Sequence, residues 1–185
     1  MKTQFCSFLL CWIIFCEFLP AQSVCGYRLL DVTNPIELLG NKILYEGKEI
    51  ELGEKTFFID GQLSDEVTAR YPFVFNSFNE AAKAFVAGTE AEPMKVYIAP
   101  YVYWIDNPDD PQVRVGKDGK EPFGLVVKCP YLHLVGLTKN PENVVLASSR
   151  GQTQGAVGNF TMFDFWGDGL SVKNLMMGNY CNVDL

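Results

Sequence analysis

Positive charge and histidine are scarce in this chain. Its 15 Lys and Arg residues stand against 22 Asp and Glu residues and one His, and the formal net charge is −7. Broad binding to nucleic acid or to an anionic membrane surface needs clustered Lys and Arg, whereas the charges here are scattered. The single His133 has no Ser and Asp arranged near it as in a catalytic triad. We therefore expect no nucleic-acid partner, and a structural or surface role for His133.

Metal-binding patterns are also missing. The sequence has no Cys-x-x-Cys pair and no Cys/His spacing typical of zinc. Asp106, Asp109 and Asp110 could offer carboxylates to Ca²⁺, but their spacing matches no calcium loop. The prolines beside them favour turns instead. We expect neither a metal nor a cofactor.

The cysteines do not make a complete set of pairs. Three of the six lie within the first 23 residues, which leaves Cys25, Cys129 and Cys181. An odd number in an exported protein indicates a free thiol or a partner further along the chain. Cys129 follows the strand-like segment Leu125–Lys128, and we expect it to pack as a small buried hydrophobic residue.

Long apolar runs are confined to the N-terminus. Lys2 precedes the apolar run Phe5–Leu19, and Pro20–Ser23 then supplies small residues for cleavage. This order predicts a signal peptide over residues 1–23, with an uncleaved N-terminal anchor as the alternative. No later run approaches the ~20 apolar residues that a membrane helix needs. We expect a protein that is secreted, periplasmic or at the cell surface, with no membrane contact after cleavage.

Short strand-like segments recur along the last third of the chain, separated by Gly, Asn and Pro. Each is too short to bury its own apolar face, so the faces must stack on one another. The final segment is still partly apolar and has no polar cap. The pattern predicts a mainly β protein, a right-handed parallel β-helix truncated at its C-terminus. The segments are Tyr131–Gly136, Asn143–Ala147, Thr161–Phe165 and Leu170–Gly178.

The remaining chain divides into an entry region and the coils themselves. Residues 24–70 are expected to form an N-terminal β region, with a hairpin over 43–52 and a strand over 56–60. Residues 71–185 are expected to form the coils. Ser77 and Glu80 have the spacing of a capping box, and Gly88 is expected to end the helix that they begin. This helix would cap the N-terminal end of the β-helix, because an open end exposes apolar side chains and unpaired strand edges.

Candidate binding residues lie in, and directly before, a glycine-rich segment over residues 151–158. It lacks the Gly-Lys-Ser/Thr ending of a phosphate-binding loop, so a flexible loop above the coils is the better interpretation. Loops on a rigid scaffold often carry binding residues. We expect Arg150, Gln152 and Gln154 to contact an acidic or hydroxylated glycan, and we assign no catalytic residue.

Aromatic residues offer a second candidate. Tyr101, Tyr103 and Trp104 could stack on sugar rings, but strand alternation sends Tyr101 and Tyr103 to one face and Trp104 to the other. Because aromatic residues dominate protein cores, core packing is the favoured interpretation for these side chains.

Several of these segments resemble one known family. Phe75–Phe85 looks like the helix that opens pectinesterases and related pectin-lyase-like β-helices. Val96–Tyr103 is similar to the strand of that family that ends in Gly-x-Tyr. Tyr131–Gly136 followed by Asn143–Leu146 looks like its next pair of strands. Thr161–Asn179 is similar to its Thr…Gly-x-Gly-Phe…Asn-Leu-Thr-Phe-x-Asn stretch.

The resemblance implies an exported, carbohydrate-active β-helix protein that acts on plant cell-wall pectin as a monomer. Pectinesterase-type ester hydrolysis is the first expectation for the full-length protein. A polysaccharide lyase or glycosidase on the same fold, and a non-catalytic glycan-binding β-helix, are the alternatives. The Asp, Arg and Gln residues that carry the reaction in pectinesterases come after the matched part of the sequence. The resemblance therefore assigns no catalytic residue here.

Overall fold

The computed structural model describes residues 36–106, 124–148 and 161–180. The expected signal peptide 1–23, most of the polar loop over 106–122, and Cys25 and Cys181 lie outside these residues. None of the helices within them is long and apolar enough to cross a membrane.

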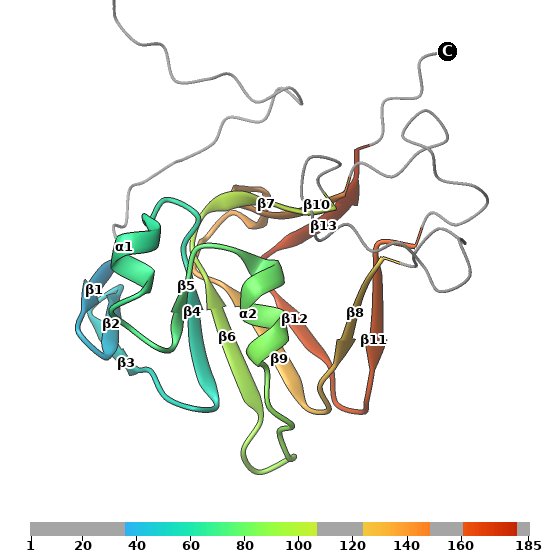
Figure 1. The fold of residues 1–185 in the computed structure, drawn as a ribbon, viewed down its shortest axis with the longest axis horizontal. Coiled ribbons are helices and arrows are strands. Elements are labelled where there is room, and N and C mark those ends of the chain that lie inside the picture. The colour runs from blue at the N-terminus through green and yellow to red at the C-terminus, as the bar shows by residue number, and fades with distance from the viewer. Residues whose placement is uncertain (1–35, 107–123, 149–160, 181–185) are drawn as a thin grey trace, which may run out of the picture.

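The described part of the chain is mainly β, and its largest sheet has five parallel strands (Figure 1). The order across this sheet is β12-β9-β6-β4-β5. β4 lies between β5 and β6, so the region expected over 24–70 contributes a strand to the same sheet as the region expected over 71–185. The strands, in chain order, are β4 (Thr56–Ile59), β5 (Val74–Phe75), β6 (Met94–Ile98), β9 (Leu132–Gly136) and β12 (Ser171–Lys173).

Two smaller parallel sheets lie beside the first (Figure 1). One has the order β13-β10-β7 and the other pairs β11 with β8. Their strands are β7 (Tyr101–Asp106), β8 (Leu125–Lys128), β10 (Val144–Ser148), β11 (Phe163–Trp166) and β13 (Met176–Asn179).

From β6 onward, each strand pairs in parallel with the third strand after it. β6 pairs with β9, and β9 with β12. β7 pairs with β10, and β10 with β13. β8 pairs with β11. The chain therefore passes through three sheets in turn and comes back alongside itself, and the expectation of a mainly β protein with stacked parallel strands is confirmed.

Alternate residues of these strands build a common core. Val96 of β6 and Leu134 of β9 are register partners, and both are fully buried. Leu146 of β10 and Val127 of β8 belong to the same apolar cluster, so all three sheets contribute to it. The burial of these side chains supplies most of the driving force that holds the sheets together.

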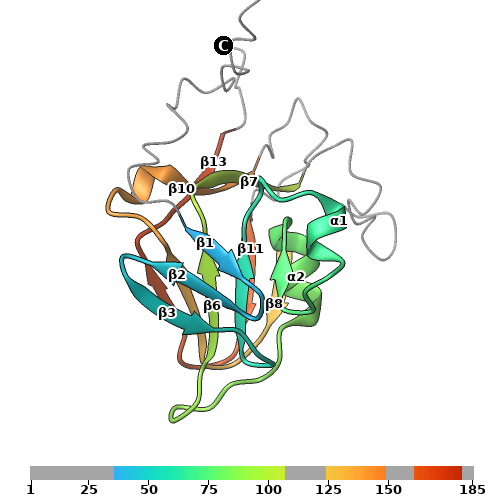
Figure 2. The ribbon, with the colours of Figure 1, turned by 90° about the vertical axis from the view of Figure 1, so that its left-hand side faces the viewer.

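The opposite face of the five-stranded sheet is covered at one end by an antiparallel sheet, β1 (Glu37–Leu39), β2 (Lys42–Tyr45) and β3 (Lys48–Glu51) (Figure 2). Ile43 and Phe58 meet in the apolar cluster between them. Glu46 and Gly47 both have positive φ, 49° and 73°, which matches the twist of a tight hairpin. The hairpin expected over 43–52 is confirmed.

The helix α2 (Phe78–Ala84) begins where expected, directly after Ser77, but its capping contacts and its C-terminal end differ from the expectation. Ser77 is the N-cap, but its side chain makes no capping hydrogen bond, and the carboxylate of Glu80 pairs with Lys83 at 2.6 Å. The capping box is therefore wrong. The helix ends at Ala84 because the next residue, Phe85, is extended (ψ 135°) and packs against the core.

The apolar face expected for this helix is confirmed. Phe78 and Ala81 are buried, and the helix contacts β4, β5 and β7. A second, four-residue helix, α1 (Asp65–Thr68), precedes β5, and a short 3-10 helix, η2 (Pro141–Asn143), precedes β10.

The segment expected as one strand over 170–178 is two strands. Asn174 has a φ of 54° and turns the chain between β12 and β13, as suits an Asn at a corner. The backbone carbonyl of Asn174 lies so close to Gly136 that a Cβ at position 136 would collide with it. Gly136 thus allows one corner to stack on the next.

Candidate functional site

The glycan contacts expected from the sequence, Arg150, Gln152 and Gln154, lie outside the described residues. The last described residue before them is Ser148 at the end of β10, which is fully buried. Asp106 ends β7, while Asp109 and Asp110 also fall outside.

The three aromatic residues of β7 lie as strand alternation predicts. Tyr103 is 3% exposed and belongs to the core, and Tyr101 packs against the same core with its ring 5.3 Å from that of Tyr103. Trp104 points to the other face and is 42% exposed. Core packing is confirmed for the two tyrosines, and they do not form a sugar-binding platform with Trp104.

One carboxyl group is set apart by its surroundings. Asp60 follows β4, and burial raises the pKa of its side chain above the ordinary value. The backbone N–H of Gln62 donates to its Oδ1 at 3.0 Å and partly opposes that shift. Burial also raises the pKa of the neighbouring Tyr103 hydroxyl, so Tyr103 is neutral at physiological pH. Asp60 therefore lies in a partly closed corner with no cationic partner among the described residues.

A different set of polar residues gathers on the outward side of the five-stranded sheet. Strands β6 and β9 send the alternate side chains Val96 and Leu134 inward, and β12 extends the same sheet beside β9. We call the outward positions of these three strands the lysine face. It consists of Lys95, Tyr97, His133, Val135, Ser171 and Lys173.

The strand register places these residues in two rows across the sheet. In the first row, His133 lies between Lys95 and Ser171. In the second row, Val135 lies between Tyr97 and Lys173. Neighbouring strands are about 4.8 Å apart, so each row presents a side chain at that spacing on a rigid support.

The charge on this face is positive, although the chain as a whole is acidic. None of its six positions carries a carboxylate. Lys95 and Lys173 are exposed and make no ion pair with any other described residue. Burial raises the pKa of Tyr97, which keeps its hydroxyl neutral and able to donate a hydrogen bond.

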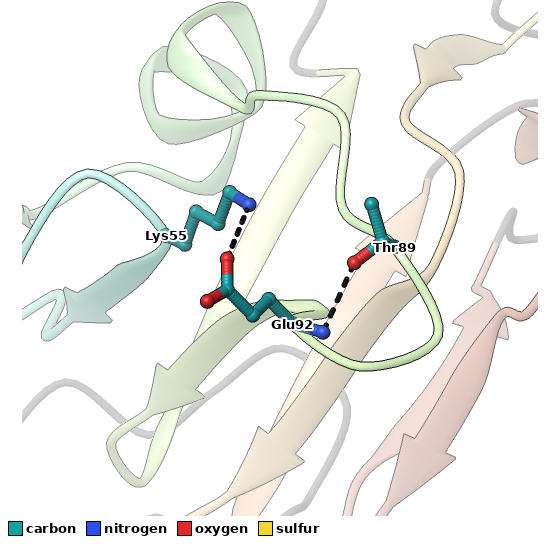
Figure 3. A network of polar contacts seen from close by, with 3 residues as sticks. All are labelled: Lys55, Thr89 and Glu92. Carbon is teal, nitrogen blue, oxygen red and sulfur yellow. Dashed lines mark hydrogen bonds and ion pairs between the residues drawn. The ribbon is translucent and has the colours of Figure 1, made fainter.

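The nearest carboxylate to Lys95 along the chain is already engaged (Figure 3). Glu92 accepts from Lys55 Nζ at 3.0 Å, and its backbone N–H donates to Thr89 Oγ1 at 3.1 Å. Lys55 is in turn tied to the sheet, because its carbonyl accepts from the N–H of Lys95. Glu92 is therefore held against Lys55 beside the lysine face.

His133 is half-buried and sits in the middle of the first row, which agrees with the structural or surface role expected for it. Sequence reasoning missed Lys95 and Lys173. The alternation of apolar and polar residues in β6 and β12 was a usable signal. The register that brings the two lysines onto one face, however, follows from strand pairing and not from either strand alone.

The buried thiol of Cys129 has no catalytic surroundings. It is 6% exposed, and its Sγ lies 3.1 Å from the carbonyl oxygen of Val86. Burial raises the pKa of Cys129, which disfavours the reactive thiolate. The expectation of a small buried hydrophobic residue is confirmed. Within the described ranges, no group of three or more His, Cys, Asp or Glu residues could hold a metal ion.

The strands β11, β12 and β13 all lie at the same end of their sheets. Several apolar side chains are exposed there. Leu170 is 43% exposed and Val172 is 41% exposed. Trp166 is 57% exposed, and Lys128 Nζ lies 4.9 Å from the centre of its ring. This end of the sheets is open within the part of the chain that the structure describes.

No protein-family model, curated protein or solved structure matches the chain.

Proposed function

We propose that this chain belongs to an exported right-handed parallel β-helix protein that acts on pectin, most directly by ester hydrolysis. The observation that supports it is the pairing of each strand with the third strand after it, from β6 to β13. A β-helix with three sheets requires this pairing, because each turn of the chain contributes one strand to each sheet. The link to pectin comes from the resemblance of residues 72–180 to pectinesterase-like sequences.

The right hand of the winding follows from a general rule. Crossover connections between parallel strands of one sheet are right-handed in nearly all proteins. In this proposal α2 caps the N-terminal end, since its apolar face packs on β4 and β5 before the first complete turn begins at β6.

The proposed chemistry is the cleavage of a galacturonate methyl ester. An Asp carboxylate attacks the ester carbonyl carbon, and an acidic partner protonates the methoxide oxygen as it leaves, which releases methanol. The same partner then takes a proton from water, which attacks the acyl-enzyme and frees the Asp and the galacturonate carboxylate. None of the described residues is assigned to these roles.

One observation favours the non-catalytic alternative, a glycan-binding β-helix. It is the lysine face, whose exposed Lys95 and Lys173 suit binding better than catalysis. Fold alone does not decide between these functions.

The deciding experiment uses the whole exported protein with methyl-esterified pectin. Release of methanol supports the esterase, whereas unsaturated products or new reducing ends identify a lyase or a glycosidase. Retardation in a pectin-containing gel without any product supports the binding protein. A protein that shows neither binding nor product overturns the proposal.

A further inference from the structure

We propose that the lysine face binds an acidic polysaccharide laid across strands β6, β9 and β12. This inference rests on the proposed function and adds to it the residues that hold the ligand. It concerns described residues only, and it is independent of Arg150, Gln152 and Gln154.

The first step is the sign of the charge. Lys95 and Lys173 are both exposed and carry no ion pair with a described residue, in a chain whose net charge is −7. Four other lysines of the structure are paired with carboxylates, as Lys42 is with Glu49 at 2.6 Å. The lysine face therefore keeps unpaired positive charge, which favours an anionic ligand.

The second step concerns the size of the ligand. Lys95 and Lys173 lie two strands apart, which is about 10 Å across the sheet. Along the strand direction they lie in neighbouring rows, Lys95 in the first and Lys173 in the second. A single exposed ion pair contributes little affinity. A ligand gains from this face only when it engages several positions together, so a repeating chain of anionic groups suits it better than a single small acid.

The third step distinguishes a sugar polymer from a nucleic acid. Nucleic acids carry a dense row of phosphates and need many cations, and the net charge of the chain repels them. Besides the two lysines the face offers hydrogen-bonding groups, the hydroxyls of Ser171 and Tyr97 and the ring nitrogens of His133. An acidic polysaccharide has spaced carboxylates with hydroxyls between them, which match the lysines and the hydrogen-bonding groups of this face.

The supporting sheet makes the arrangement rigid. In β6 and β9 each outward residue is followed by a buried one, such as Val96 or Leu134, both 0% exposed. The core therefore fixes the positions of Lys95 and His133 before any ligand arrives, which lowers the entropy cost of binding.

The test compares two variants of the whole exported protein that lose the same charge. One is Lys95→Gln/Lys173→Gln on the lysine face. The control is Lys48→Gln/Lys83→Gln, which removes exposed lysines from β3 and α2. Binding to polygalacturonate, galacturonate and fully methyl-esterified pectin is measured at low and at high salt, and circular dichroism checks that each variant is folded.

We expect the lysine-face variant to bind polygalacturonate about three- to tenfold more weakly than the parent, and the control to bind within twofold of it. The difference should shrink at high salt, and binding to the single sugar should be weak in all three proteins. Equal loss in both variants overturns the inference, as does stronger binding to the esterified polymer.

If the parent binds pectin and the lysine-face variant is unaffected, only the lysine face is refuted. If the parent binds another acidic polymer through these lysines but binds no form of pectin, the inference stands and the proposed function fails.

Discussion

The hydroxyl of Tyr103 closes a turn that lies 42 residues earlier in the chain, where it accepts a hydrogen bond from the backbone N–H of Gly61 at 3.2 Å. The same hydroxyl donates to the carbonyl of Ala99 at 2.9 Å. The ring is buried in the core, so this one side chain joins the end of β4 to the start of β7.

Replacing Tyr103 with Phe should lower the free energy of unfolding by about 1–3 kcal/mol, because it leaves these backbone groups without their partner. Tyr101→Phe is the matched control, since the Tyr101 ring packs on the same core and its hydroxyl is not needed for that packing. Urea denaturation measures both. Equal destabilisation by the two changes would show that the hydrogen bonds of the Tyr103 hydroxyl do not contribute to the free energy of unfolding.

Asp60 should make stability depend on pH. Burial raises the pKa of its carboxyl in the folded state, so the folded protein holds this proton more tightly than the unfolded chain does. Stability contributed by the protonated group is present below the unfolded pKa and is lost as pH rises through the folded pKa. The side chain of Asn stays neutral at every pH. The stability of the Asp60→Asn variant relative to that of the parent should therefore be higher at neutral pH than in acid.

Urea midpoints of the two proteins between pH 3 and pH 7 measure this difference. The amide oxygen of Asn can still accept from the N–H of Gln62, which preserves the turn. Two curves that stay parallel over the whole range would contradict the prediction.

Gly136→Ala should be strongly destabilising. Its Cβ would collide with the carbonyl oxygen of Asn174 in the next corner of the chain, and backbone cannot move aside as a flexible side chain does. A cost of about 1–3 kcal/mol is typical of such overpacking. Gly53→Ala is the control, because a Cβ there meets nothing within 4 Å and the residue has no positive φ. The thermal midpoint should fall in the first variant and stay within a few degrees in the second.

A preparation of residues 24–185 should aggregate or stay partly unfolded. The strands β11, β12 and β13 present edges without a neighbour among the described residues, with Leu170 and Val172 exposed beside them. Such edges pair readily with other chains. Sedimentation and thermal denaturation test this, and a sharp cooperative melt of a monomer would refute it.

Val172→Lys places a charge at the open end and should reduce the association, since charged residues on edge strands oppose pairing. Lys83→Gln, far along the chain on α2, should leave it unchanged. Association that persists equally in both variants would point to a different surface.

The sequence was most informative where alternation is regular. Leu132 and Leu134 alternate with half-buried residues, and this period-two pattern predicted β9 nearly to its ends. It was least informative where one residue changes the path of the chain. Asn174 splits an expected strand, because an Asn is compatible with both a strand end and a left-handed corner. Phe85 ends α2 early because its ring is drawn into the core, a tertiary effect that helix propensity does not contain.

The candidate site was harder to predict for a related reason. The Gly-rich segment with Arg150 was chosen for its composition, which says nothing about neighbours in space. Lys95 and Lys173 are 78 positions apart in the sequence. They come onto one face only through the pairing of β6 with β9 and of β9 with β12. Register of this kind is a property of the assembled sheets.

The place of β4 has a consequence for how the protein is made. β4 ends at Ile59, yet its two neighbours are β5 at residues 74–75 and β6 at residues 94–98. During synthesis β4 is joined first by β5, about fifteen residues later, and its other edge stays open until β6 has emerged, some forty residues after β4 ends. An open strand edge can pair with another chain, so the growing protein is exposed to misassembly until β6 covers that edge.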